Sequence, residues 1–332
     1  MARTSYLITG GAGFIGSHLV EALLGRGSRV VVLDDLSTGR MVNLDGVGSH
    51  PDFRFEQGSV LDDVLVDELV NECDVVVHLA AAVGVHRILD KPLESFLINV
   101  EGTEFVLAAA KRHKRRCLLA STSEIYGMNS SGPLSEDSDR HLGPPTVTRW
   151  SYSTAKAVDE ILAFLYHREY GLPTTVVRLF NTVGPRQSPA YGMVVPRLVR
   201  QAVAGEPLTI YGDGCQTRCF CHVLDVVDCL IRLLDDPRSI GEVFNVGSGE
   251  EVSMLELAGR IRNRTRSSSP VRMVPYEEAY KAGFADMRRR VPDTTKVRTL
   301  TGWMPTRGLN DVLDETIAEA LAERATMGSF LV

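Results

Sequence analysis

A tyrosine and a lysine four residues apart, Tyr152 and Lys156, are the side chains in this sequence best suited to proton transfer. At this spacing two residues of a helix share one face, so the phenol and the ammonium would lie side by side. A neighbouring cation stabilises a phenolate and lowers the pKa of the tyrosine from its usual value of about 10. Tyr152 could therefore act as a general base toward an alcohol, although such pairs also arise by chance on helix surfaces.

A second group of reactive side chains, residues 121–124, directly follows an apolar run that is expected to form a strand, Cys117–Ala120. Ligands of open parallel sheets bind at the carboxyl ends of the strands. The hydroxyl of Thr122 and the carboxylate of Glu124 are therefore expected near a bound substrate. Glu124 has a second interpretation, in which its side chain faces solvent or binds nearby backbone.

A glycine-rich turn, residues 9–18, joins the first predicted strand to the first predicted helix. Glycines at Gly10, Gly13 and Gly16 allow the backbone to approach a pyrophosphate, which the amides of a helix N-terminus bind. Asp34 follows about 20 residues later, at the end of the second predicted strand, where a carboxylate accepts hydrogen bonds from ribose hydroxyls and repels a 2′-phosphate. The pattern predicts a site for NAD rather than NADP.

The first half of the chain alternates apolar runs with helical patterns, which is typical of a parallel sheet covered by helices on both faces. The predicted strands are Tyr6–Thr9, Arg29–Leu33, Phe53–Gln57, Asp74–Leu79, Cys117–Ala120 and Thr174–Leu179. The predicted helices are Phe14–Leu24, Asp62–Asn71, Leu93–His113 and Ser153–Tyr170. We expect a doubly wound α/β (Rossmann) domain.

Beyond about Gly184 proline and glycine become frequent, and the helical patterns are interrupted. Such a segment usually covers the carboxyl edge of a parallel sheet and contributes the pocket of the second ligand. We therefore expect an NAD-binding domain over residues 1–183 and a smaller, mainly substrate-binding domain over residues 184–332, with elements that can interleave.

The composition excludes several classes of protein. The chain of 332 residues has a formal net charge of −6, which disfavours a nucleic-acid partner. It contains no apolar run long enough to cross a membrane and no signal-peptide pattern, so a cytoplasmic enzyme is expected. Cys215, Cys219 and Cys221 precede His222 but lack the paired spacing of a structural zinc site, and no metal is expected.

Taken together, these motifs resemble the extended short-chain dehydrogenase/reductase family, which comprises the NAD-dependent nucleotide-sugar epimerases, dehydratases and decarboxylases. The resemblance extends from about residue 4 to about residue 320. Its further marks are His78-Leu79-Ala80-Ala81, Asn99 with Gly102-Thr103, Arg178-Leu179-Phe180-Asn181, Gly184-Pro185-Arg186, Tyr211-Gly212-Asp213-Gly214, Gln216-Thr217-Arg218, His222-Val223, Asp225, Arg290-Val291-Pro292-Asp293, Gly302-Trp303 and Pro305.

The resemblance implies roles for individual residues. Thr122 would bind the reacting sugar hydroxyl, Tyr152 would exchange its proton, and Lys156 would hold the nicotinamide ribose. The other residues expected to bind NAD are Gly10, Gly13, Phe14, Ile15, Asp34, Leu36, Ser37, Thr38, Gly39, Ser59, Val60, Leu79, Ala80, Ala81, Val83, Asn99 and Ala120. Those expected to bind the UDP-sugar are Val85, Ser123, Glu124, Asn181, Arg186, Val195, Tyr211, Gln216, Arg218, Arg290 and Asp293. A homodimer formed through two helices is also expected.

The sequence leaves the reaction open between several outcomes of one 4-keto intermediate. The helix sequence Tyr152-Ser153-Thr154-Ala155-Lys156 resembles that of the epimerases, which favours a UDP-sugar 4-epimerase that converts UDP-glucuronic acid to UDP-galacturonic acid. Thr122-Ser123-Glu124 instead resembles the UDP-glucuronate decarboxylases. A UDP-glucose 4-epimerase is a further alternative, and an NAD-binding relative without catalysis is the non-enzymatic one. Dehydration is disfavoured, because Ser123 replaces the aspartate that dehydratases usually carry.

Overall fold

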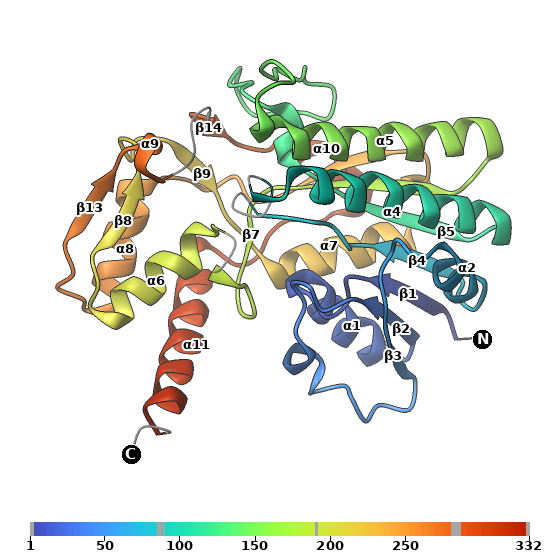
Figure 1. Cartoon of the computed structure of the whole chain (residues 1–332), viewed down its shortest axis with the longest axis horizontal. Helices are drawn as coiled ribbons and strands as arrows, with labels where there is room; N and C mark the ends of the chain where they lie inside the picture. The colour runs from blue at the N-terminus through green and yellow to red at the C-terminus, as the bar shows by residue number, and fades with distance from the viewer. Residues whose placement is uncertain (1–2, 85–87, 89, 190–191, 280–286, 330–332) are drawn as a thin grey trace.

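The backbone of the first half forms one parallel sheet, seen in the centre and right of Figure 1. The computed structural model describes residues 3–84, 88, 90–189, 192–279 and 287–329. In spatial order the seven strands are β11 (Val243–Val246), β6 (Thr174–Leu179), β5 (Arg116–Thr122), β4 (Val75–His78), β1 (Ser5–Thr9), β2 (Arg29–Asp34) and β3 (Phe53–Gln57). Neighbouring strands are parallel throughout, as the continuous apolar runs predicted.

All six predicted strands and all four predicted helices are confirmed, and their ends differ from the predicted ones by about two residues at most. The helices are α1 (Phe14–Gly25), α2 (Asp63–Asn71), α4 (Pro92–His113) and α5 (Ser151–Tyr170). The seventh strand, β11, was not predicted, because it comes from the second half of the chain. Helix α7 (Val223–Asp235) also comes from that half and packs on α1. The two halves therefore interleave.

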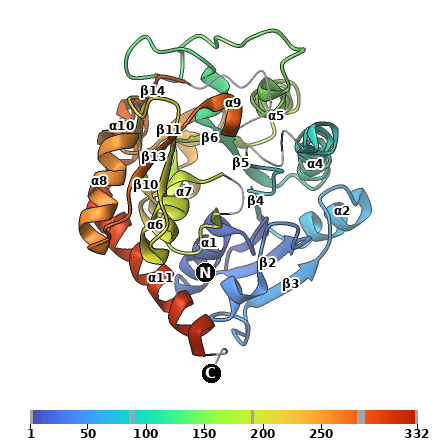
Figure 2. The ribbon, with the colours of Figure 1, turned by 60° about the vertical axis from the view of Figure 1, so that its left-hand side comes forward.

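Alternate side chains of each central strand enter different cores. Ile8 faces a core that also contains Leu19 of α1 and Leu230 of α7, whereas its neighbour Leu7 faces a core with Leu107 of α4. Figure 2 shows α1 and α7 on one side of the sheet and α2, α4 and α5 on the other. This two-sided burial fixes the direction in which each strand presents its last side chains.

A smaller region lies beyond the carboxyl edge of the sheet, on the left of Figure 1. Its own apolar core joins three helices, α6 (Val194–Ala204), α8 (Met254–Thr265) and α11 (Leu309–Ser329). Its short strands are β7 (Thr182–Val183), β8 (Leu208–Tyr211), β9 (Thr217–Cys219), β10 (Cys221–His222), β12 (Glu251–Ser253), β13 (Val271–Val274) and β14 (Arg289–Arg290). The remaining helical segments are α9 (Tyr276–Ala279), α10 (Thr295–Thr301) and the 3₁₀ turns η1 (Met41–Leu44), η2 (Ser123–Tyr126), η3 (Thr148–Trp150) and η5 (Pro237–Ser239).

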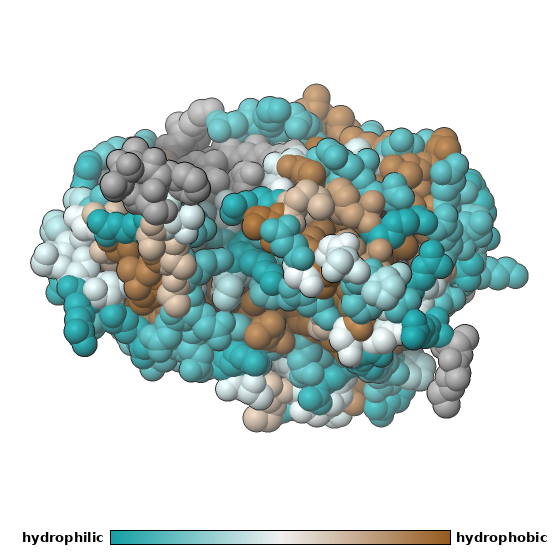
Figure 3. All heavy atoms as spheres, turned by 90° about the horizontal axis from the view of Figure 1, so that it is seen from below, coloured by the Kyte–Doolittle hydropathy of each residue, from teal (hydrophilic) through white to brown (hydrophobic). Residues whose placement is uncertain are grey.

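The face of the molecule that is seen in Figure 3 is mainly hydrophilic, with hydrophobic residues in separate groups. None of the described helices is both long and apolar enough to cross a membrane. Over the same described residues, no three His, Cys, Asp or Glu side chains are grouped so that they could hold a metal ion.

A buried ion pair joins helix α5 to strand β6. The guanidinium of Arg178 donates to the carboxylate of Glu160, with Nη2 2.7 Å from Oε2. Arg178 Nη1 also donates to the hydroxyl of Tyr126 over 2.9 Å, and that hydroxyl donates to Asn245 on β11. Ser121, the penultimate residue of β5, donates to Glu160 as well. One carboxylate therefore ties α5 to the strand that ends in Thr122.

Removing the charge of Glu160 should destabilise the fold, because Arg178 would remain buried without its counter-ion. We expect Glu160→Gln to lower the free energy of unfolding by about 3 kcal/mol, as measured by urea denaturation. Glu169→Gln, at the exposed end of the same helix, is the control and should change it by less than about 0.5 kcal/mol. Equal effects of the two substitutions would contradict a central role for the buried pair.

Candidate active site

A cavity of about 490 Å³ lies where the carboxyl ends of the parallel strands meet the smaller region. The glycine turn and the ends of β2, β4 and β5 line one part of it. Residues of α6, β8, β9 and β14 line the other. This is the position at which open parallel sheets bind ligands, and it brings together residues from both halves of the chain.

The glycine turn has the backbone geometry that a dinucleotide requires. Gly10 has a φ of +73°, a conformation that a side chain would strain, and a β-carbon there would lie 2.8 Å from the backbone nitrogen of Ala80. A β-carbon at Gly16 would lie 2.3 Å from the carbonyl oxygen of Gly10. Helix α1 begins after Gly13 with no side-chain cap and no acidic residue in its first turn. Its first amides and its dipole are therefore suited to a phosphate.

Asp34 lies at the end of β2, next to the glycine turn, and is 7% exposed. Its carboxylate accepts hydrogen bonds from the backbone N–H groups of Ala12, over 2.9 Å, and Leu36, over 2.8 Å. Burial raises the pKa of Asp34, and these two hydrogen bonds act against that rise. Gly39 packs so closely on the carboxylate that a β-carbon would lie 2.7 Å from Oδ1. These contacts hold the loop that follows β2 against the carboxylate of Asp34, at the edge of the cavity.

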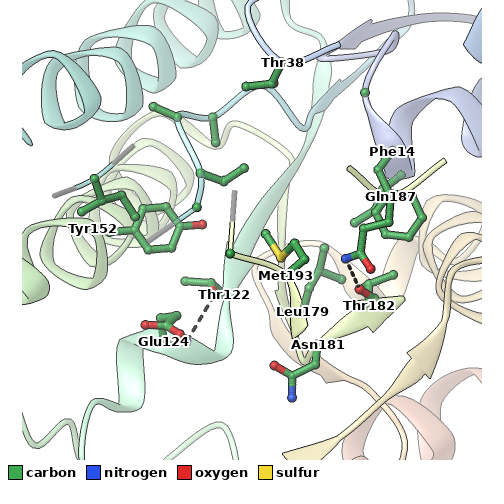
Figure 4. Close-up of a pocket in the computed structure, with 18 of the residues that line it drawn as sticks. Phe14, Thr38, Thr122, Glu124, Tyr152, Leu179, Asn181, Thr182, Gln187 and Met193 are labelled. Carbon is green, nitrogen blue, oxygen red and sulfur yellow. Dashed lines mark hydrogen bonds between the residues drawn. The ribbon is translucent and has the colours of Figure 1, made fainter. Parts of the chain in front are cut away.

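Thr122, Tyr152 and Lys156 come together at the carboxyl end of β5. Thr122 is the last residue of that strand, and its hydroxyl accepts a hydrogen bond from the backbone N–H of Glu124 over 3.2 Å. Figure 4 shows the phenol of Tyr152 and the side chain of Thr122 pointing into the same space. Lys156 lies one turn further along α5, where its Nζ is 2.9 Å from Oδ2 of Asp159. All three predicted residues line the cavity.

The pKa of Tyr152 differs from the sequence-based expectation. Burial raises it far above its usual value, and the negative charges of Glu124 and Asp159 raise it further. A hydrogen bond with Thr122 and the positive charge of Arg149 lower it only in part. The predicted lowering is therefore outweighed in this structure, because the ammonium of Lys156 is paired with a carboxylate and the phenol is desolvated.

Glu124 is held between two arginines. Its Oε2 is 2.5 Å from Nη2 of Arg149, and its Oε1 is 2.6 Å from Nη1 of Arg290. Burial opposes the ionisation of this carboxyl, but the two guanidinium groups outweigh it and lower the pKa to about 2. Arg290 also donates to Oδ1 of Asn181 over 2.8 Å. Glu124 therefore stays ionised at neutral pH inside the cavity, and the alternative of a solvent-facing side chain is wrong.

Most of the residues expected to bind ligands line the cavity. Beyond the catalytic three, those expected at NAD are Gly10, Gly13, Phe14, Ile15, Asp34, Ser37, Thr38, Val60, Leu79, Ala80, Ala81, Val83 and Ala120. Those expected at the sugar nucleotide are Ser123, Glu124, Asn181, Val195, Tyr211, Gln216, Arg218 and Arg290. Four residues expected at NAD do not line the cavity: Leu36, Gly39, Ser59 and Asn99. Val85 falls outside the described residues.

Two predicted substrate contacts lie elsewhere. Arg186 pairs with Glu21 of α1 over 2.7 Å and donates to the hydroxyl of Ser17, so its charge is used between the two regions of the chain. Asp293 accepts a hydrogen bond from the backbone N–H of Thr295 at the start of α10. Neither lines the cavity. Motif order alone could not indicate the direction of these side chains.

Several lining residues were missed by the sequence analysis. Arg149 precedes Tyr152 by three residues, and this spacing could have placed its charge on the face of Tyr152. Arg197 stacks on the ring of Tyr211 at 4.3 Å. Gln187 donates to the carbonyl oxygen of Thr182 over 2.9 Å, as the dashed line between them in Figure 4 shows. The latter contacts join segments that no local pattern connects.

Comparison with known proteins shows which family the chain resembles. The model of a family described as the NAD dependent epimerase/dehydratase family matches residues 6–247. A UDP-N-acetyl-alpha-D-glucosaminuronate decarboxylase of Bacillus cytotoxicus is 42% identical over 313 residues, which cover 94% of this chain and 96% of that protein. The UDP-glucuronic acid decarboxylase 1 of Danio rerio is 36% identical over 315 residues, covering 95% of this chain and 72% of that protein.

A solved structure supports the same family. It is that of a UDP-glucuronic acid 4-epimerase from Bacillus cereus in complex with UDP-glucuronic acid and NAD, with a TM-score of 0.87. Its sequence is 30% identical, and the match covers 96% of this chain and 100% of the other.

Neutralising Asp34 should weaken NAD binding, because an amide is a poorer acceptor for ribose hydroxyls than a carboxylate. We expect Asp34→Asn to raise the Kd of NAD at least about tenfold, as measured by calorimetry. Asp35→Asn, at the adjacent residue, is the comparison and should have a smaller effect. A larger effect at Asp35 would contradict the assignment of Asp34 to the ribose.

Proposed function

The chain belongs to the NAD dependent epimerase/dehydratase family, and from this membership we propose that it removes carbon dioxide from a UDP-linked uronic acid. The observation that carries the proposal is the position of Glu124 between Arg149 and Arg290, beside Thr122 and Tyr152. The decarboxylases among the relatives support it. The 4-epimerase favoured by the sequence alone becomes the second candidate.

The charges of this site suit an acidic sugar. Two buried guanidinium groups, those of Arg149 and Arg290, face one carboxylate at the wall of the cavity. Nε of Arg290 is also buried and makes no hydrogen bond to the described residues. A planar guanidinium binds a carboxylate through two parallel hydrogen bonds, so the carboxylate of a uronic acid complements this wall. Arg186, which was expected to bind the UDP-sugar, points toward α1 instead.

The first step would be oxidation of the sugar at C4. Tyr152, as its phenolate, removes the proton of the C4 hydroxyl, which Thr122 orients by a hydrogen bond. Bound NAD would supply the hydride acceptor for this oxidation and the hydride for the final reduction. The glycine turn and Asp34 would hold it at the cavity, and Tyr152 and Thr122 would hold the C4 hydroxyl there. The product of this step is a 4-keto uronic acid.

Decarboxylation follows from the chemistry of that 4-keto acid. The bond between C5 and C6 breaks, C6 leaves as carbon dioxide, and the electron pair moves through C5 to the C4 oxygen. The phenol of Tyr152, now protonated, donates a hydrogen bond to that oxygen and stabilises its negative charge. A proton is then added at C5, and return of the hydride to C4 gives a UDP-pentose. The net reaction consumes one proton and releases one carbon dioxide.

Glu124 would favour this outcome through charge. Because its pKa is about 2, Glu124 stays ionised and shares the two arginines with the carboxylate of the substrate. Two carboxylates at one site repel each other, and departure of carbon dioxide moves one of those charges from the carboxylate to the C4 oxygen, where Tyr152 donates a hydrogen bond. A neutral residue at this position would lack that effect.

The second candidate, a 4-epimerase, has its own support. The structure resembles the UDP-glucuronic acid 4-epimerase of Bacillus cereus, and the helix sequence from Tyr152 to Lys156 is of the epimerase form. An epimerase would keep the carboxylate and return the hydride to the other face of C4. The two reactions therefore differ in whether carbon dioxide is released.

Product analysis tests the proposal. The protein, NAD and either UDP-glucuronic acid or UDP-N-acetylglucosaminuronic acid should yield carbon dioxide and a UDP-pentose, followed by NMR. Tyr152→Phe should reduce turnover by about 10³-fold, because the general base is lost. Tyr170→Phe is the matched control: its side chain is exposed at the end of the same helix, so turnover should persist. A UDP-hexuronic acid epimer without carbon dioxide would establish the second candidate instead.

Glu124→Gln separates decarboxylation from oxidation. An amide cannot balance two guanidinium groups, so we expect carbon dioxide release to fall about 100-fold while oxidation at C4 persists. Absorbance of reduced cofactor at 340 nm should then accumulate in a single turnover. Glu169→Gln should behave as the unmodified protein. Equal losses in the two steps would contradict a role for Glu124 in the loss of carbon dioxide.

A further inference from the structure

The ammonium of Lys156 forms an ion pair with a carboxylate, that of Asp159, which does not line the cavity. Asp159 lies one turn along α5, and its Oδ2 is 2.9 Å from Nζ of Lys156. The exposed fractions of the two side chains are 3% and 0%. An ammonium has three N–H donors. One donor directed at Asp159 leaves two that can face a ligand in the cavity.

Asp159 is in turn contacted by a chain of polar groups from three other elements. Hydrogen bonding from the hydroxyl of Thr103, on α4, lowers the pKa of Asp159 against the effect of burial. Nε2 of His78, at the end of β4, is 3.2 Å from that hydroxyl. Nδ1 of His78 is 2.7 Å from the hydroxyl of Thr9, at the end of β1. All of these side chains are buried.

The chemistry of these groups gives the chain one direction. Burial lowers the pKa of His78 to about 3, with a further contribution from the charge of Lys156, so the ring is neutral with one N–H. If Thr103 donates to Asp159, then Nε2–H of His78 donates to Thr103, and Nδ1 accepts from Thr9. The backbone N–H of Ala80 donates to Thr9 over 3.2 Å. His78, Thr9 and Thr103 then each have a partner, and the chain points toward Asp159.

We propose that Asp159 is a positioning residue that fixes the ammonium of Lys156 beneath the cofactor, and that Thr103, His78 and Thr9 fix Asp159. Thr9 immediately precedes Gly10, and Ala80 packs on Gly10. Hydrogen bonds thus connect the glycine turn to Thr103 through His78, and the ion pair with Asp159 holds the lysine. The inference rests on the proposed function in one respect, the use of Lys156 and Tyr152 in catalysis.

The charges around Tyr152 give the proposal a testable sign. The pKa of the phenol is influenced by Glu124 of η2, Arg149 of η3 and Asp159 of α5, and Asp159 is paired with Lys156. Asp159 itself is influenced by Lys156 and Glu160. The negative charge of Asp159 raises the pKa of Tyr152, so its removal should lower that pKa while Lys156 keeps its charge.

Asp159→Asn keeps the shape of the side chain and removes its charge. We expect kcat to fall about 10- to 100-fold, because the ammonium is no longer held in place, and the KM of the sugar nucleotide to change little. The acidic limb of the pH profile of kcat should move to lower pH, because the pKa of Tyr152 falls. Glu169→Gln should leave both unchanged. A limb that stays in place or moves to higher pH would overturn the proposal.

A pair of variants at Thr103 tests the chain without changing any charge. Thr103→Val removes the hydroxyl and keeps the shape, whereas Thr103→Ser keeps the hydroxyl. We expect the valine variant to lose several-fold in kcat and in NAD affinity, and the serine variant to retain both. Added to Asp159→Asn, Thr103→Val should have little further effect, because both act through one carboxylate. Equal activity of the two Thr103 variants would overturn the proposed role of Thr103. Full additivity of the losses from Thr103→Val and Asp159→Asn would overturn it as well.

NAD affinity, measured by calorimetry, separates this inference from the proposed function. If the unmodified protein releases no carbon dioxide from either uronic acid, the proposed reaction is wrong. The positioning of Lys156 is still tested, because Asp159→Asn should weaken NAD binding and Thr103→Ser should not. Unchanged NAD affinity in Asp159→Asn and Thr103→Val would overturn the inference, whatever the reaction is.

Discussion

The carboxylate of Glu160 and the guanidinium of Arg178 are buried between α5 and β6, and the reactive side chains lie on the elements that this pair joins. Thr122 ends β5, Tyr152 lies in the first turn of α5, and Ser121 binds the same carboxylate. Helix packing on a sheet tolerates small shifts, whereas a buried ion pair with several hydrogen bonds has one favourable geometry. The contact between α5 and β5 therefore sets the approach of the phenol to the substrate.

Two further carboxylates, those of Glu124 and Asp159, act on the pKa of the same phenol. Glu124 is balanced by two arginines and Asp159 by one lysine, yet both raise the pKa of Tyr152. A tyrosine that is buried and near two negative charges is a poor base. The positive charge of an oxidised nicotinamide would oppose this effect, so a base of this kind becomes effective when NAD is in place. Charge balance thus links cofactor binding to proton transfer.

The sequence predicted the parts of the site that depend on local patterns. The strands before the glycine turn and before Thr122 were found because doubly buried strands are continuous apolar runs. Asp34 was found because the edge of a parallel sheet brings the ends of β1 and β2 together. Tyr152 and Lys156 were found because four residues make about one turn of a helix. In each case the spacing along the chain determines the position in space.

The remaining features depend on contacts between distant segments. Arg290 contacts Glu124 across 166 residues of sequence, and Arg186 contacts Glu21 across 165. Both arginines were expected at the substrate, and only the packing of β14 against β9 and of the 184–186 segment against α1 distinguishes them. The distinction affects the chemistry, since Arg290 places its charge beside an ionised glutamate within reach of the phenol. A carboxylate bound there lies next to a second negative charge, which favours its departure as neutral carbon dioxide over its retention.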